Sequence, residues 1–149
     1  MKSPKDIFHV VSYLQYPPML TAVYYCIKPY IHLNSFNDIL VHYNIALIFA
    51  GLGISLSTLQ DTTKTQNNFS KRIWQDPKKG KIGLFVVGIT AFSFILAGLY
   101  GLYAAQGEIL QELSLGMTVL GIGQVGLLKV AIEMFENHRL NKKGEQESS

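Results

Sequence analysis

Cysteine and charge are both scarce in this sequence. Its 149 residues include a single cysteine, Cys26, which excludes an intrachain disulfide and a CxxC redox or zinc motif within one protomer. Charged residues make up 15% of the chain, compared with about a quarter of a typical soluble domain. Because 48% of the residues are apolar, the chain has room for several long apolar segments and for little polar surface.

Motifs for catalysis and for nucleic-acid binding are lacking as well. The chain has no HExxH, no GxSxG, no cysteine paired with a histidine, and no acidic pair deep within an apolar segment. It also has no glycine-rich loop entering a helix and no long basic face. We therefore expect a protein that is not an enzyme, holds no cofactor and binds no nucleic acid.

The longest uninterrupted apolar stretch is Ile82 to Ala105. It contains no charged residue, no His, Asn or Gln, and no Pro. As an α-helix it would be about 36 Å long, enough to cross a hydrocarbon core of about 30 Å with some tilt. A helix on the surface of a soluble protein needs one polar face, and this stretch has none. The sequence therefore predicts a transmembrane helix.

Three other segments have comparable length and composition. The expected spans are about 7–31, 39–59, 82–105 and 113–135, which predicts an all-α integral membrane protein with four transmembrane helices in an antiparallel bundle. Pro17 and Pro18 should kink the first helix, because they remove backbone donors and clash with the preceding turn. Residues 1–140 would form one domain, with a cytoplasmic loop at 60–81, and residues 141–149 a disordered polar tail.

The basic residues indicate the orientation of these spans. With four spans, twelve of the thirteen lysines and arginines fall on one face, counting Lys129 as reaching that face along its stem. Lys28 is left on the other face. Since positive charge accumulates on the cytoplasmic side, we expect an inner or plasma membrane protein with both termini in the cytoplasm.

Small residues recur at helical spacing in the spans. In lipid, such residues let two helix backbones approach closely, within one protomer or between copies. The glycines at 116, 123 and 126 lie roughly on one stripe, which can receive the small-residue face of another span, for example Ala91, Gly98 and Ala105. The candidate helix-packing residues are Gly51, Gly53, Ala91, Gly98, Gly116, Gly123 and Gly126.

A few polar residues are expected within the spans. Lys129 and Glu133 are four residues apart on one helix face, which favours a structural ion pair; a site for an ion, a proton or an anionic headgroup is the alternative. We interpret Gln124 as an interhelical hydrogen-bonding group. Alternatively, Gln15, Asn44 and Gln124 line a polar path.

The connecting segments contain two further candidate sites. The loop at 60–81 has basic residues around a tryptophan, and a turn of helix near Ser70–Gln75 would place them at lipid headgroups. The candidate headgroup residues are Lys71, Arg72, Trp74, Lys78, Lys79 and Lys81. His32, Asp38 and His42 form a weak candidate for metal binding, because their spacing matches no established motif. We therefore predict no metal site.

These observations favour a small structural or accessory subunit of the membrane. Such a protein would pack against membrane lipids and against itself, as a homo-oligomer, or against the subunits of a larger membrane complex. The alternative is a small oligomeric channel or transporter that uses the polar path. A membrane enzyme acting on lipid or quinone at the cytoplasmic rim is a third class.

Overall fold

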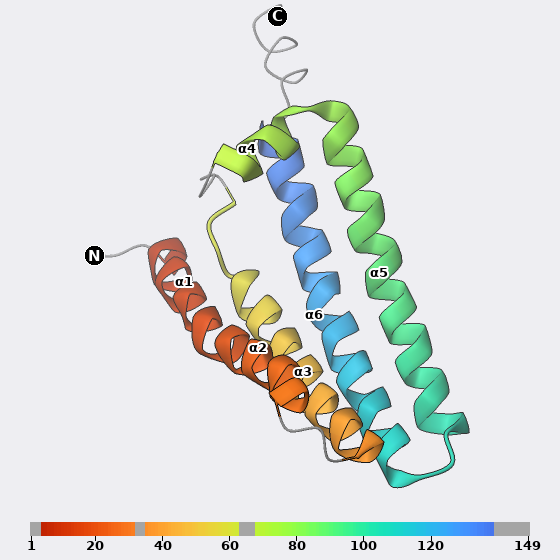
Figure 1. The fold of residues 1–149 in the computed structure, drawn as a ribbon. Coiled ribbons are helices and arrows are strands. Elements are labelled where there is room, and N and C mark those ends of the chain that lie inside the picture. Colours follow the sequence, from red (N-terminus) through yellow and green to blue (C-terminus); the bar gives the residue numbers. More distant parts are fainter. Residues whose placement is uncertain (1–3, 32–34, 63–67, 139–149) are drawn as a thin grey trace, which may run out of the picture.

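The computed structural model describes residues 4–31, 35–62 and 68–138, and every regular element among them is helical (Figure 1). The first helical run consists of α1 (Pro4–Ser12), the 3-10 turn η1 (Tyr13–Gln15) and α2 (Tyr16–Ile31). It is followed by α3 (Phe36–Ser57), the short α4 (Asn68–Gln75), α5 (Pro77–Ala104) and α6 (Glu108–His138). The all-α prediction is confirmed for the described residues. The predicted tail at 141–149 lies outside them.

Three of these helices, α3, α5 and α6, are long and apolar enough to cross a membrane. They contain 22, 28 and 31 residues, which correspond to about 33, 42 and 46 Å. This indicates a membrane protein. By contrast, α2 has only 16 residues, and it reaches the length of a span only together with η1 and α1, which precede it without a break.

The 3-10 turn stands where the proline kink was predicted. The structure has the tighter turn at Tyr13–Gln15 and starts α2 at Tyr16, immediately before Pro17 and Pro18. Proline has no N–H to donate, so the carbonyls one turn earlier lose their α-helical partners. A 3-10 turn inside a helical run is a usual response to such a loss. The helical course continues on both sides of it.

The starts of α3 and α5 are fixed by side-chain caps. The Ser35 hydroxyl accepts a hydrogen bond from the Asp38 N–H at 3.2 Å. Asp76 accepts hydrogen bonds from the N–H groups of Lys78 and Lys79, at 2.9 and 3.2 Å. Pro77, which has no N–H to satisfy, occupies the first turn of α5. These caps explain why both helices begin before the apolar runs that were read from the sequence.

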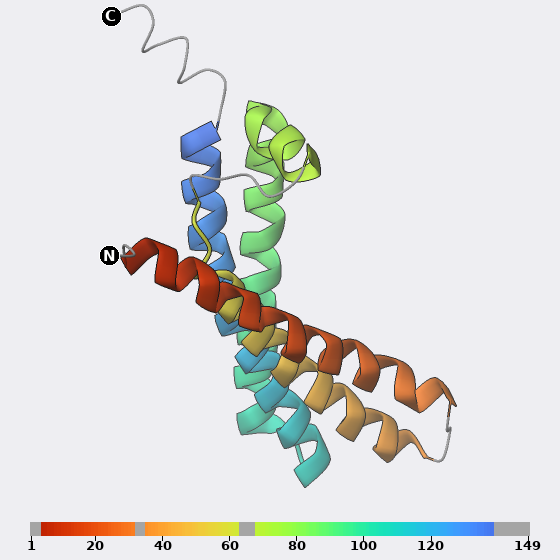
Figure 2. The same cartoon turned by 90° about the vertical axis from the view of Figure 1, so that its left-hand side faces the viewer.

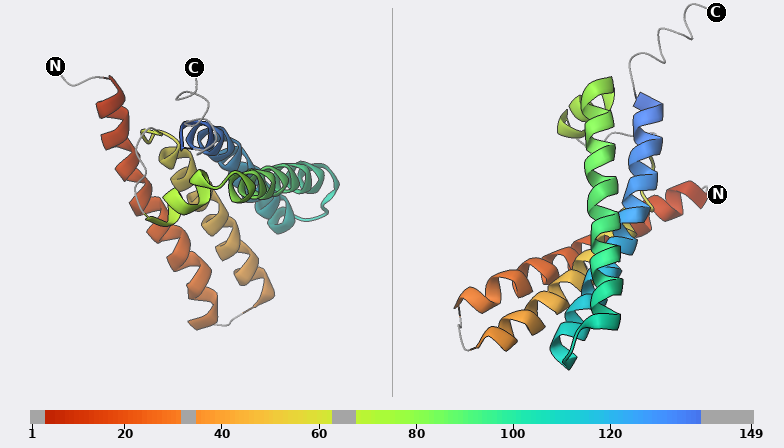
Figure 3. Two further views of the ribbon diagram at one scale, coloured as in Figure 1. Left: turned by 90° about the horizontal axis from the view of Figure 1, so that it is seen from above. Right: turned by 90° about the vertical axis from the view of Figure 1, so that its right-hand side faces the viewer.

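The long helices form a row in the order α2, α3, α6, α5. The extensive contacts are those of α2 with α3, α3 with α6, and α6 with α5. The α1–α3 hairpin lies oblique to the α5–α6 hairpin (Figures 2 and 3). The central pair is parallel, since Asn44 and Gly51 of α3 and Thr58 directly after it meet Gly116, Gly123 and Gly126 of α6 in the same order. In an antiparallel bundle of four successive spans the second and the fourth also run in the same direction, so this agrees with the expected connectivity; the row, however, places α3 and α6 in direct contact.

The place of each helix in the row determines how much of its surface is buried. The buried apolar residues include Leu120, Val130, Ala131, Met134 and Phe135 of α6, the helix with neighbours on two sides. The flanking helix α5 leaves large side chains exposed, among them Phe85 at 67% and Leu96 at 66%. In water, so much contiguous apolar surface would promote aggregation. A hydrocarbon environment removes that cost.

Candidate functional site

The centre of the row is a close contact between α3 and α6 through glycines. A Cβ atom added at Gly51 would lie 2.8 Å from the Val119 carbonyl oxygen and 3.0 Å from the Leu120 Cα atom. A Cβ atom added at Gly123 would lie 2.6 Å from the Gly51 carbonyl oxygen. A side chain at either position would have to push the opposite backbone away, so glycine is what permits this approach.

Two of the contacts between α3 and α6 are two helical turns apart. Asn44 and Gly51 are seven residues apart on α3, as are Gly116 and Gly123 on α6. At the end of the contact, a Cβ atom added at Gly126 would lie 3.0 Å from the Thr58 Cγ2 atom. Thr58 is seven residues beyond Gly51 but Gly126 is only three beyond Gly123, so the register changes where α3 ends. The α6 glycine stripe is thus occupied by α3.

The partner suggested for that stripe was α5, and this suggestion is wrong. Gly98 of α5 lies instead against Ser114 and Thr118, and Gly121 lies against Ala91 and Ile95. Ala91 is completely buried there. Ala105, the third residue expected on the α5 face, follows the last residue of the helix. α6 carries small residues on two faces because it is packed between two helices.

Gly53 makes a third kind of contact, with the first helical run. A Cβ atom added at Gly53 would lie 2.7 Å from the Met19 Cγ atom and 3.4 Å from the Gln15 carbonyl oxygen. Residues two apart on a helix point in nearly opposite directions. Gly53 therefore faces α2 while Gly51 faces α6, and Gln15 lies on the other side of α3 from Gln124.

Two amide oxygens in the α3–α6 pair are buried without a hydrogen-bond partner among the described residues. They are Oδ1 of Asn44, a residue that is 8% exposed, and Oε1 of Gln124. The Asn44 oxygen lies against the backbone at Gly116. Gln124 is eight residues further along α6, or about 12 Å away along the helix axis. Gln15, Asn44 and Gln124 are therefore not brought together.

Lys129 and Glu133 form the ion pair that their spacing predicts. Lys129 Nζ and Glu133 Oε1 are 2.9 Å apart, and the two side chains are 75% and 42% exposed. The pair borders a pocket of about 370 Å³ between α1, the segment after α3, and α6, lined by Phe8, Thr58, Leu59, Gln60, Asp61, Thr62, Lys129 and Glu133. Nearby, the Asp61 N–H donates to His9 Nδ1 over 3.5 Å and links α1 to this segment.

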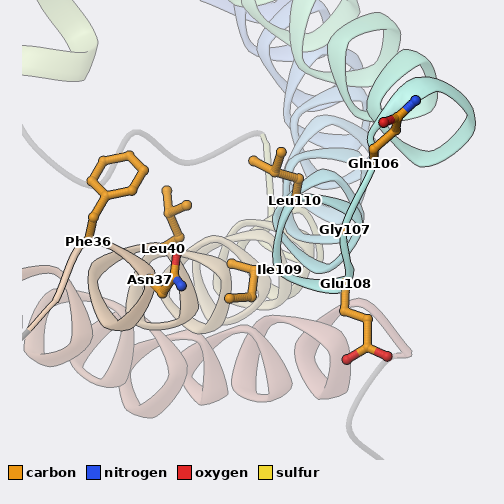
Figure 4. A pocket seen from close by; sticks show the side chains of 8 residues that line it. All are labelled: Phe36, Asn37, Leu40, Gln106, Gly107, Glu108, Ile109 and Leu110. Atoms are coloured by element: carbon orange, nitrogen blue, oxygen red, sulfur yellow. The ribbon is translucent and has the colours of Figure 1, made fainter.

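A second pocket, of about 440 Å³, lies at the opposite end of the helices. It opens between the start of α3 and the α5–α6 turn (Figure 4). Leu40, Ile109 and Leu110 point toward the space between the helices, while Gln106 and Glu108 carry their polar groups away from it. Its wall is therefore mostly apolar, with Asn37 as a further polar lining residue, and offers little for the recognition of a polar ligand.

The candidate headgroup residues gather around the elbow between α4 and α5. The Arg72, Lys78, Lys79 and Lys81 side chains are exposed, and Lys79 Nζ lies 3.4 Å from Asp76 Oδ2. Trp74 is half-buried and approaches α5 at Gly83. Lys71 lies on α4, but its side chain is outside the described part of the chain. α4 itself covers the turn of helix predicted near Ser70–Gln75.

The electrostatics of the elbow centre on Asp76. The hydrogen bond from the Lys79 N–H is the largest of the effects that hold the pKa of the Asp76 carboxyl below its usual value. The Lys78 N–H and the Lys79 side chain act in the same direction, against the opposing effect of desolvation. The ionised carboxylate is therefore the capping form.

The described residues of the weak metal candidate are engaged locally. His42 Nδ1 lies 2.6 Å from the Asp38 carbonyl oxygen, and the Asp38 carboxylate accepts a hydrogen bond from the Ser35 hydroxyl at 2.8 Å. His32 lies outside the described residues. Among those that are described, no three His, Cys, Asp or Glu side chains are grouped so that they can hold a metal ion.

Sequence reasoning missed an aromatic cluster where α2 approaches α3. Lys28 Nζ lies 5.9 and 5.5 Å from the ring centroids of Tyr24 and Tyr25. The Tyr25 ring is 5.8 Å from that of His42. The Tyr30 and Tyr43 hydroxyls form a hydrogen bond of 2.7 Å. The spacing of Tyr24, Tyr25 and Lys28 on one helix was the signal for this cluster in the sequence. Its contacts with α3 could not be read there, because they form only when α2 and α3 pair as a hairpin.

The chain was compared with protein-family models, with curated proteins and with solved structures, and none of them matches it.

Proposed function

We propose that the protein is a non-enzymatic structural or accessory subunit that packs with itself or with a larger membrane complex. The observation that carries this proposal is the open row of helices. α2 and α5 each pack extensively against a single long helix. Their outward faces carry large exposed side chains, including Leu20 at 71% and Leu96 at 66%. A neighbouring membrane protein can extend the row on either flank.

The same proposal includes four membrane crossings with both ends in the cytoplasm. The run Pro4–Ile31 extends for about 42 Å as a helix, which supports its role as the first span. Toward one end of the row lie the start of α1, α4, the start of α5 and the end of α6 (Figure 1). That end carries Lys78, Lys79 and Lys81, as expected for the cytoplasmic side.

The elbow would hold this end at the lipid headgroups. Trp74 is half-buried next to α5, and the exposed cations around it can approach anionic lipid phosphates. Indole rings are favoured at the membrane interface because they combine an apolar body with a polar N–H group. The role proposed for the elbow is to fix the depth and tilt of α5.

A channel or transporter is the weaker alternative. Its polar path needs Gln15, Asn44 and Gln124 along one lumen, whereas α3 separates Gln15 from Gln124. A path would then have to form between copies of the chain. An enzyme at the membrane surface is weaker still, because the sequence contains none of the catalytic motifs considered above.

The test is native mass spectrometry of the chain purified in a mild detergent. We expect a homo-oligomer or a complex of fixed stoichiometry with another membrane protein. Two double variants test the two outer helices of the row: F92A/L96A on α5 and L20A/V23A on α2. We expect one of these double variants to lose the oligomer or complex without a lower melting temperature of the chain. The control Leu120→Ala, inside the row, should lower it. A monomer, or a complex that withstands both pairs, would contradict the proposal.

A further inference from the structure

The pocket beside Lys129 and Glu133 combines features that a lipid headgroup site needs. Its wall comes from three parts of the chain: Phe8 of α1, residues Thr58–Thr62 after α3, and two residues of α6. Its volume of about 370 Å³ is within the usual range for small-ligand pockets. It contains both an ammonium and a carboxylate, and Phe8 adds an apolar side.

The depth of the pocket follows from the α3–α6 register. Gly126 lies level with Thr58, close to where α3 ends at Ser57. Lys129 is three residues beyond Gly126, or about 4.5 Å further along α6. The charged pair is therefore at the end of a membrane-crossing helix, where hydrocarbon gives way to headgroups.

The charges of the pocket remain accessible to a ligand. An exposed ion pair within one helix contributes little to stability, and Lys129 and Glu133 keep 75% and 42% of their side chains exposed. The Lys129 ammonium and the Glu133 carboxylate lie 2.9 Å apart. They complement a ligand that carries a negative and a positive group next to each other. A phosphate can accept from Lys129 while an adjacent ammonium donates to Glu133.

We infer that this pocket binds a zwitterionic phospholipid with a primary ammonium, of the phosphatidylethanolamine class. A trimethylated ammonium has no N–H to donate to Glu133, so phosphatidylcholine forms a weaker contact. An anionic headgroup has no ammonium to donate to the Glu133 carboxylate and would bring a further negative charge next to it. The acyl chains would leave the pocket along the apolar surface beside Phe8. This inference does not depend on the subunit role.

The test is native mass spectrometry of the chain from detergent supplied with equal amounts of phosphatidylethanolamine, its mono- and dimethylated forms, phosphatidylcholine and phosphatidylglycerol. We expect phosphatidylethanolamine to be retained about fivefold over phosphatidylcholine, as for one exposed charge-assisted hydrogen bond. Retention should fall stepwise with methylation. Equal retention of the series, or preferential retention of phosphatidylglycerol, would overturn the inference even without a variant.

Variants locate the effect in the pocket. Glu133→Gln should reduce the preference for phosphatidylethanolamine, and Lys129→Met should lower retention of both zwitterionic lipids. Glu112→Gln alters an exposed charge outside the pocket and should behave as wild type. An unchanged preference in Glu133→Gln would overturn the assignment. Excess glycerophosphoethanolamine should leave the lipid bound, whereas displacement would show that the free headgroup is the ligand.

Discussion

Gly51 of α3 and Gly123 of α6 approach so closely that a Cβ atom on Gly123 would stand 2.6 Å from the Gly51 carbonyl oxygen. The Gly51 carbonyl also accepts a hydrogen bond from the Ser55 hydroxyl, at 2.8 Å, so its position is fixed within α3. The contact joins two parallel helices that are far apart in the sequence. The rest of the row depends on it, because α2 is attached through α3 and α5 through α6.

We predict that Gly123→Ala destabilises the protein by about 1–3 kcal/mol, the usual cost of forcing an extra methyl group into a packed contact. Gly88→Ala is the matched control, since the nearest atom to its Cβ would be Leu128 Cδ2, at an ordinary 3.8 Å. Unfolding in detergent, followed by circular dichroism, measures both variants. A similar effect of the two substitutions would show that glycine at 123 is not needed for packing.

The apolar length of the segments sufficed to predict three long helices, but α3 and α5 begin before the predicted starts at about 39 and 82, because Ser35 and Asp76 cap them earlier in the chain. The neighbours of each helix were harder to predict. Small residues at a spacing of seven tell which face of a helix is closely approached, but not by which helix. α6 shows the difficulty, because it has small residues on two faces and the stripe at Gly116 was assigned to the wrong one.

In the candidate site, too, a contact within one helix could be predicted from the sequence, whereas contacts between distant segments could not. The spacing of Lys129 and Glu133 was enough to predict their ion pair, because both residues are on one helix. The pocket beside them also needs Phe8 and the segment after α3, which only the tertiary structure brings there. Likewise, the separation of Gln15 from Gln124 follows from the opposite directions of Gly51 and Gly53, and the sequence does not determine which neighbour each of them faces.

Asp76 should make the start of α5 sensitive to acid. Its pKa in the folded protein lies below the usual value of 3.8, so the ionised cap stabilises α5 above that value and the contribution is lost as the pH falls through the lowered pKa. The Lys78 and Lys79 amide resonances should shift over that range. Asp76→Ser, which caps without titrating, should abolish the shift. If the variant titrates like the wild type, the carboxyl is not responsible.

Substitution of Gln124 and of Asn44 by leucine should have different effects on the stability of the protein. Gln124 Oε1 has no hydrogen-bond partner among the described residues, so Gln124→Leu should leave stability unchanged or raise it by about 1 kcal/mol. Asn44→Leu places a branched side chain against the backbone at Gly116 and should cost about 1–3 kcal/mol. Thermal unfolding in detergent measures both effects. Loss of an ion or solute flux in liposomes with Gln124→Leu, without loss of folding, would instead favour the transporter.

The proposed topology places Lys79 and Asn37 on opposite sides of the membrane. Lys79 follows the start of α5 and Asn37 follows the start of α3, at opposite ends of the row (Figure 1). Single cysteines, K79C and N37C, are introduced after the exposed Cys26 is replaced by alanine. In intact cells, an impermeant maleimide should label N37C and spare K79C, because positively charged segments stay in the cytoplasm. Permeabilised cells, in which both should react, provide the control. Labelling of K79C in intact cells would refute the cytoplasmic placement of the basic end, and equal protection of both cysteines would contradict a membrane crossing by α3.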